Sequence, residues 1–305
     1  MSVIQRSRTF YGLALGEHLL VDAIRRGRVD ELAAFVDRTG ADFVLVGVER
    51  VSRTAPRPTA ALSPSVSAAA LIAATADVGV FVTAVPHLDH PYNLARRLAS
   101  LDHTSRGRVG WLTGVEDRSA PGNLASAGVW IEPGPSPAVT TDAIHASRTL
   151  WESWPADTIR GRPGDVRFAD SDRIVYADHQ GVFDIAGPLN VPTPPQQKIP
   201  VAWWAEEGDD IVSAAEVSDI VVLSGGDVDR HGTAVRERAL LFVVDDPDAT
   251  GVDGHIATVT DLDAGFSAWA RPPRPRGYRQ RSLRATLRLP DPAAAPAHRR
   301  PVYPG

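Results

Sequence analysis

The sequence contains no cysteine and only one methionine. The absence of cysteine excludes disulfide bridges, thiolate zinc sites and cysteine nucleophiles. No segment approaches the roughly 18 consecutive apolar residues that a membrane span requires. The first residues, MSVIQRSRTFYG, lack the apolar stretch of a secretory signal. We therefore expect a soluble cytoplasmic protein that does not enter a membrane.

Basic residues are fewer than acidic residues in this chain. The chain has 32 Lys and Arg residues against 37 Asp and Glu residues, which gives a formal net charge of −5. Nucleic-acid binding requires a basic surface, so this balance argues against a nucleic acid as the main partner. A glycine-rich G-x-G-x-x-G segment after a strand is likewise missing, and a Rossmann dinucleotide site is therefore not supported.

Strand-like and helix-like patterns alternate along most of the 305 residues. Short apolar runs rich in β-branched residues are typical of parallel strands that are covered on both faces. The predicted strands are Phe10–Leu15, Phe43–Val48, Val78–Val82, Arg108–Thr113, Val201–Ala205, Ile220–Leu223, Ala239–Val244 and a weaker one at His255–Val259. The predicted helices are Val29–Thr39, Ser65–Thr75, Thr141–Trp154, Ile211–Val217 and one that begins at the proline after His90.

Seven or eight strands alternating with helices predict a (β/α)₈ TIM barrel. We expect one barrel domain over residues 1–270, with a hairpin excursion near Asp178. Residues 271–305 are rich in Pro, Arg and Ala, and this tail is expected to pack on the barrel or to be partly disordered.

Four segments carry the most specific pattern in the chain. They are HPYNLARRLASLDHTSRGRVGW (His90–Trp111), LWESW (Leu150–Trp154), DHQGVFDIAGPLNVPTPPQ (Asp178–Gln196) and RGYRQRSLRATLRLPDP (Arg276–Pro292). In this order and spacing they resemble the luciferase-like, FMN-dependent monooxygenases. The branch that they resemble contains the nitrilotriacetate, dibenzothiophene-sulfone and pristinamycin-type enzymes. One such match is plausible by chance, whereas four are not.

The resemblance implies a TIM barrel that uses O₂ and reduced FMN, supplied by a separate flavin reductase, to oxidise a small organic substrate. The pocket is expected at the carboxyl ends of the strands. The residues that the resemblance places at a flavin pocket are Glu49, Thr83, Trp111, Thr113 and Trp203. His87 and His90 are weak candidates for acid–base catalysis, and the alternative is that they form polar surface. No metal site is predicted.

The chain departs from the family pattern at several flavin-binding positions. Gly47 and Val48 stand where the family usually has an Ala-Asp pair, and Leu112 replaces an asparagine. The segment WWAEEGDD replaces a Gln-Ala-Gly-x-Ser segment that helps to hold the phosphate. Its carboxylates are Glu206, Glu207, Asp209 and Asp210. Carboxylates stabilise a helix N-terminus, but they also repel a phosphate, so we expect weak FMN binding.

Three functions remain open at this point. The chain is an active monooxygenase with a remodelled pocket, a catalytically silent barrel that serves as partner subunit of an active relative, or a barrel enzyme that no longer uses flavin. A homodimer or a heterodimer is expected, through helices that include the Ala60–Thr75 region, because small residues allow helices to approach closely. The sequence does not identify the substrate.

Overall fold

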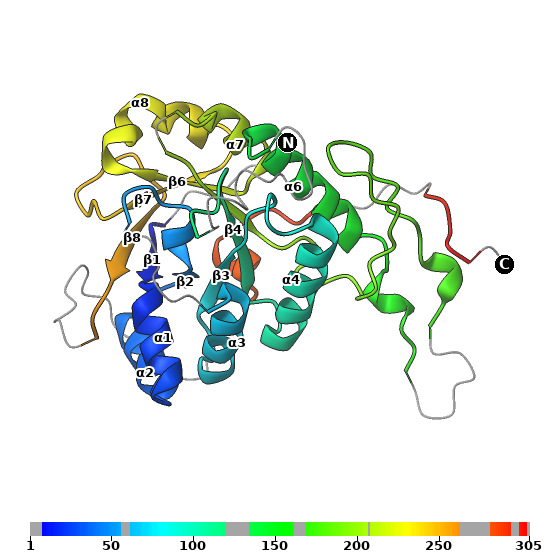
Figure 1. The fold of residues 1–305 in the computed structure, drawn as a ribbon, viewed down its shortest axis with the longest axis horizontal. Helices are drawn as coiled ribbons and strands as arrows, with labels where there is room; N and C mark the ends of the chain where they lie inside the picture. The colour runs from blue at the N-terminus through cyan, green and yellow to red at the C-terminus, as the bar shows by residue number, and fades with distance from the viewer. Residues whose placement is uncertain are drawn as a thin grey trace.

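The computed structural model describes residues 8–55, 62–119, 134–161, 169–206, 208–262, 281–293 and 299–303. Eight parallel strands follow one another in chain order and form a closed barrel, and helices cover its outside (Figure 1). The predicted TIM barrel is confirmed. Within these ranges no helix is both long enough and apolar enough to cross a membrane.

Strands and helices alternate around the barrel. The strands are β1 (Phe10–Leu15), β2 (Phe43–Val46), β3 (Gly79–Thr83), β4 (Val109–Thr113), β5 (Val201–Trp204), β6 (Ile220–Ser224), β7 (Leu240–Val244) and β8 (Gly254–Val259). The helices are α1 (Glu17–Arg25), α2 (Val29–Thr39), α3 (Pro64–Ala74), α4 (Pro91–Ser105), α6 (Pro137–Trp151), α7 (Ile211–Val217), α8 (Gly225–Arg236) and α9 (Leu283–Thr286). Short 3₁₀ turns lie at η1 (Val48–Arg50), η2 (Ala156–Thr158) and η3 (Ser171–Arg173).

Side chains on the strands divide into an inner and an outer core, because successive residues of a strand point to opposite faces. Phe10, Phe43, Phe81 and Phe242 belong to the inner core. The rings of Phe43 and Phe242 stack with centroids 5.3 Å apart. The outer core lies between strands and helices and includes residues such as Leu13. The interior is therefore packed with side chains and forms no open channel.

The C-terminal segment closes the amino-terminal end of the barrel. Leu283, Leu287 and Leu289 belong to the inner core. Leu283 fills the space beside Gly79, the first residue of β3, and its backbone N–H donates to the carbonyl of Gly107 at 2.7 Å. Residues 281–293 thus pack against the barrel. The predicted boundary at residue 271 lies outside the described residues and stays a prediction.

Three of the four signature segments meet at this closed end. Gln196 donates from Nε2 to Asp102 Oδ1 at 2.8 Å and to the Val109 carbonyl at 2.7 Å. Its Oε1 accepts the backbone N–H of Arg284 at 2.8 Å. The guanidinium of Arg284 donates to the carbonyls of Lys198 and Pro290. The motifs that identify the family therefore join β4 to the C-terminal segment, at the end opposite to the expected active site.

The fourth signature segment fixes the loop-rich excursion between α6 and β5. Ser153 Oγ accepts the backbone N–H of Leu189, and Thr193 Oγ1 donates to the Trp151 carbonyl at 2.7 Å. The excursion, drawn in green in Figure 1, lies beside the C-terminal end of the chain.

The predicted hairpin near Asp178 is present but short. His179 and Ile185 exchange both backbone hydrogen bonds at 2.9 Å. Just before it, Val175 does not join the hairpin but pairs with Pro301.

Asp102, in the network with Gln196, has a buried carboxylate that predicts a pH-dependent stability. Burial raises its pKa from 3.8 to about 6, although its hydrogen bonds oppose the shift. The contribution of Asp102 to stability is therefore complete below about pH 4 and is lost as the pH rises through 6. We expect the unfolding free energy of the native chain, relative to Asp102→Asn, to fall by about 2 to 3 kcal/mol between pH 4 and 7. Urea unfolding at several pH values measures this difference, and a constant difference would contradict the assignment.

Candidate functional site

The carboxyl ends of the strands form the mouth of the barrel, where TIM-barrel active sites lie. The segment after β2, residues 48–55, crosses this mouth, and we call it the strap. It begins after Gly47, whose φ of 87° turns the chain at the end of β2. From there it reaches the segments that follow β4 and β5, two and three strands away in the barrel order.

Apolar side chains of the strap fill the centre of the mouth. Val48 and Val51 are each only 7% exposed and belong to the inner core, together with Val85, Leu112 and Trp204. A side chain at Gly114 would lie 3.0 Å from Val51 Cγ1. The strap therefore continues the packing of the barrel interior up to its surface.

Hydrogen bonds fix the strap to the segment after β4. The backbone N–H of Arg118 donates to the Arg50 carbonyl at 2.7 Å, and the Arg118 guanidinium donates to the carbonyls of Ser52 and Ala55. In return Arg50 Nη1 donates to Asp117 Oδ2 at 3.2 Å and to Ser119 Oγ at 2.6 Å. Each segment thus contributes one arginine whose side chain donates hydrogen bonds to the other segment.

The far end of the strap is bound to the segment after β5. Glu206 Oε1 accepts the backbone N–H of Arg53 at 2.6 Å and the indole N–H of Trp204 at 3.2 Å. Arg53 Nη2 donates to Asp209 Oδ1 at 3.2 Å. Asp210 caps α7 by accepting the Ser213 N–H at 3.0 Å. These three carboxylates of the predicted acidic turn therefore have structural partners. Glu207 lies outside the described residues.

Two more carboxylates, those of Glu17 and Asp117, lie beside Arg50, and that of Glu49 lies beside Glu17. Glu17 begins α1, Asp117 follows β4, and Glu49 belongs to the strap itself. Glu49 Oε1 accepts the N–H of Glu17 at 2.7 Å and so takes the place of an N-cap side chain, which Gly16 lacks. Arg50 Nη2 lies 3.8 Å from Glu17 Oε1. Burial raises the pKa of Glu17, Arg50 lowers it, and the neighbouring carboxylates raise it further.

The two histidines of the β3–α4 loop have different surroundings. His87 is 7% exposed, and neither of its ring nitrogens has a hydrogen-bond partner. Burial lowers its pKa, while Asp117 and Glu116 oppose that shift. His90 caps α4, because its Nδ1 accepts the backbone N–H of Tyr92 at 3.2 Å. His87 therefore belongs to the mouth, whereas His90 has a structural task.

The structure separates the residues that the resemblance placed at a flavin pocket. Glu49 and Thr83 lie at the mouth. Trp111 and Trp203 belong to the outer core, and the indole of Trp111 donates to the Ala84 carbonyl at 2.8 Å. Thr113 lies two residues after Trp111 in the same strand, so its side chain points to the same face, and it is fully buried. Cofactor contacts of these five residues stay a prediction, and only two of the five side chains are in a position to make them.

Trp204 and Leu112 are the aromatic and aliphatic side chains that face the interior at the ends of β5 and β4. Leu112 stands at the position of the usual family asparagine, so an apolar contact replaces an amide there. The alternation of side chains along β5 explains why Trp204 points inward and Trp203 outward.

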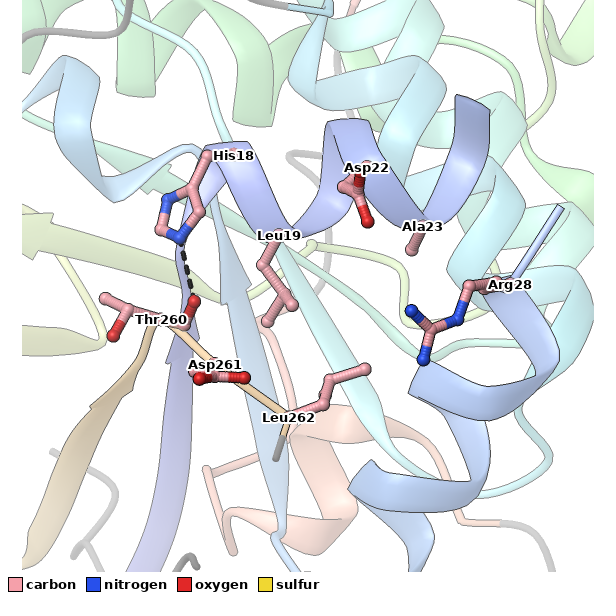
Figure 2. Close-up of a pocket in the computed structure, with 8 residues that line it drawn as sticks. All are labelled: His18, Leu19, Asp22, Ala23, Arg28, Thr260, Asp261 and Leu262. Atoms are coloured by element: carbon pink, nitrogen blue, oxygen red, sulfur yellow. Dashed lines mark hydrogen bonds between the residues drawn. The ribbon is translucent and has the colours of Figure 1, made fainter. Parts of the chain in front are cut away.

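A cavity of about 220 Å³ lies outside the barrel, between α1 and the segment after β8. Figure 2 shows its lining, with His18, Asp22 and Arg28 facing Asp261 and Leu262, and a hydrogen bond of 2.7 Å joins His18 Nε2 to the Thr260 carbonyl oxygen. None of its lining residues belongs to the inner core or to the carboxylates beside Arg50.

The sequence did not identify Glu17, Arg50, Asp117 or Arg118 as site residues. Their only sequence signal is their place directly after strands β1, β2 and β4, since residues after barrel strands converge at one end. In the part of the chain that the structure describes, no three histidine or acidic side chains are placed to hold a metal ion.

Comparisons with known proteins agree with this fold. The family model of luciferase-like monooxygenases matches residues 10–240. One of the subunits of pristinamycin IIA synthase from Streptomyces pristinaespiralis is 29% identical over 278 residues, which cover 87% of this chain and 90% of that relative. Nitrilotriacetate monooxygenase component A from Aminobacter aminovorans is 34% identical over 148 residues, which cover 47% of this chain and 32% of that protein.

Among solved structures, a riboflavin lyase in complex with modified FMN and riboflavin matches with a TM-score of 0.63 and 22% identity. The match covers 78% of this chain and 62% of that one. The chain thus spans nearly all of the pristinamycin relative, but less than two thirds of the other two proteins.

Proposed function

Since this chain belongs to the luciferase-like monooxygenase family, we propose that it is a barrel subunit that does not bind flavin, in an enzyme of two luciferase-like chains. In this proposal the second chain binds reduced FMN and oxidises a small organic substrate. The present chain binds that partner and stabilises it. The observation that carries the proposal is the strap across the mouth.

The mouth does not fit a reduced flavin. An isoalloxazine ring needs an open apolar surface at the mouth, and here Val48 and Val51 occupy that surface. An FMN phosphate needs N–H donors, hydroxyls or cations. The buried carboxylates of Glu17 and Asp117 share one arginine, Arg50, and the carboxylate of Glu49 lies beside Glu17. Both the shape and the charge of the mouth therefore oppose the cofactor.

Helix α3 offers a surface for a partner barrel. None of its eleven residues, PSVSAAALIAA, is charged, and the helix is apolar on every side. Its outward side carries Val66, which is 57% exposed. A helix that is apolar all around is ordinarily buried, which supports a protein contact on this face. Small side chains such as those of Ala69 and Ala73 allow a partner helix to approach closely.

The relative whose length this chain nearly spans is named as one subunit of a synthase. That name describes an assembly of more than one chain for the relative. Because the overlap covers 90% of that relative, the comparison supports the same kind of assembly for this chain.

A second candidate function is a monooxygenase that itself uses reduced FMN from a separate reductase. Its support is the family model, together with relatives that are named monooxygenases. The two candidates differ in a single property of the isolated chain, which is flavin binding at the mouth.

The proposed assembly is tested by co-expressing this chain with luciferase-like chains from the same genome. Sedimentation of the purified proteins should show a complex with one such chain, and monooxygenase activity should rise when this chain is added to the partner. Val66→Lys should weaken the complex, whereas Val212→Lys, at an exposed valine of α7, should not. Activity of this chain alone with reduced FMN would contradict the proposal.

A further inference from the structure

Buried polar atoms without partners collect at the mouth. Within the described ranges they include both carboxylate oxygens of Glu17, Oε2 of Glu49, Oγ1 of Thr83 and both ring nitrogens of His87. Buried polar groups normally have hydrogen-bond partners, so each exception needs an explanation. Arg8, Arg97, Ser147 and Trp203 carry such atoms elsewhere in the fold, whereas these six atoms belong to residues at the ends of β1, β2 and β3.

These residues lie at the ends of three adjacent strands. Glu17 follows β1 and Glu49 follows β2. Thr83 is the last residue of β3, and His87 lies in the loop after it. Neighbouring strands are about 4.8 Å apart, so their ends are within reach of one small molecule. The N–H of Glu17 bonds Glu49 at 2.7 Å, and a side chain at Gly47 would lie 3.3 Å from Thr83 Cβ.

The cluster has an excess of negative charge. Arg50 is the cation nearest to these carboxylates, and its Nη1 already donates to Asp117 and Ser119. Its Nη2 is 3.8 Å from Glu17, which is longer than a hydrogen bond. Buried carboxylates are stable when they are paired with a cation or accept hydrogen bonds. Burial also raises the pKa of Glu17, and Arg50 opposes that shift only in part.

We propose that Glu17, Glu49, Thr83 and His87 bind a small cation that carries several N–H donors, an ammonium ion or the head of a primary amine. Two carboxylates, a hydroxyl and a neutral imidazole offer acceptors on several sides of such a group. The strap contains Glu49 and packs Val48 and Val51 into the mouth, so we expect room for a small ligand only. This site has the opposite charge preference to a phosphate site, and it does not depend on the proposed partner subunit.

The test measures the melting temperature and the binding isotherm of the full chain with four chloride salts at equal ionic strength. The cations are ammonium, methylammonium, tetramethylammonium and sodium, at about pH 8, where imidazole is neutral. Ammonium and methylammonium should raise the melting temperature in a saturable way. Tetramethylammonium has the same charge but no N–H donor, and it should have no such effect, nor should sodium.

Three variants complete the test. Glu17→Gln and Glu49→Gln should each weaken methylammonium binding by about tenfold or more, whereas Asp30→Asn, at an exposed carboxylate of α2, should leave it unchanged. If Glu17→Gln does not fold, Glu49→Gln decides, because a glutamine oxygen still caps α1. Equal shifts with all four salts, or binding unchanged in the glutamine variants, would overturn the proposal.

Discussion

Replacing Arg108 with methionine is expected to lower the free energy of unfolding by at least about 4 kcal/mol. The Arg108 side chain is buried and makes five hydrogen bonds, to the carbonyls of Ile72, Thr75, Val78 and Ser105 and to Thr75 Oγ1. Two of these carbonyls end α3, where a helix leaves acceptors without partners. Methionine preserves much of the volume but removes the donor of all five buried hydrogen bonds.

Chemical denaturation of Arg108→Met measures this loss. The matched control is Arg96→Met in α4, where the arginine is exposed, and its unfolding free energy should change by no more than about 0.5 kcal/mol. Losses of similar size in the two variants would show that Arg108 does not join α3 to β4.

Replacing Arg50 with alanine is expected to cost about 3 to 5 kcal/mol and to free the strap. Arg50 is 15% exposed and pairs with Asp117, while Glu17 lies nearby. Removing the guanidinium leaves two buried carboxylates without their cation. The variant should also become sensitive to limited proteolysis within residues 48–55.

Arg53→Ala is the control within the strap. Its side chain is 53% exposed and pairs with Glu206 and Asp209 at the surface, so its loss should cost less than about 1 kcal/mol. Equal proteolysis and equal stability of Arg50→Ala and Arg53→Ala would contradict the role of Arg50 as the buried anchor of the strap.

The barrel was predictable because its signals are local. The apolar run Phe10–Leu15 and the amphipathic segment Val29–Thr39 have the predicted bounds in the structure. Helix α8 was not predicted, since its sequence GGDVDRHGTAVR contains three glycines and has low helix propensity. Helix α1 was also missed, although its pattern EHLLVDAIR is amphipathic.

The mouth was not predictable, because its contacts join distant parts of the chain. Arg50 and Asp117 are 67 positions apart, and Arg53 and Glu206 are 153 apart. No periodicity shows that the segment after β2 crosses to β4 and β5. The sequence did show that acidic residues stand where the family usually has its phosphate-binding segment. The structure adds that Glu206 and Asp209 bind the strap.

The motifs that carry the family resemblance have a physical task of their own. Asp102, Gln196 and Arg284 join at the closed end of the barrel, far from the mouth. A chain that keeps these residues keeps the scaffold. The residues at the mouth are not part of this network, so a familiar scaffold does not by itself supply a flavin site.

Titration of the isolated chain with FMN, in both the oxidised and the reduced state, tests the central claim most directly. Absorbance and flavin fluorescence report the bound fraction. We predict a colourless protein whose dissociation constant for FMN is weaker than about 1 mM, because the strap fills the mouth and carboxylates follow β1, β2 and β4 there. A yellow protein, or saturable FMN binding at micromolar concentration that Arg50→Ala does not alter, would contradict the account.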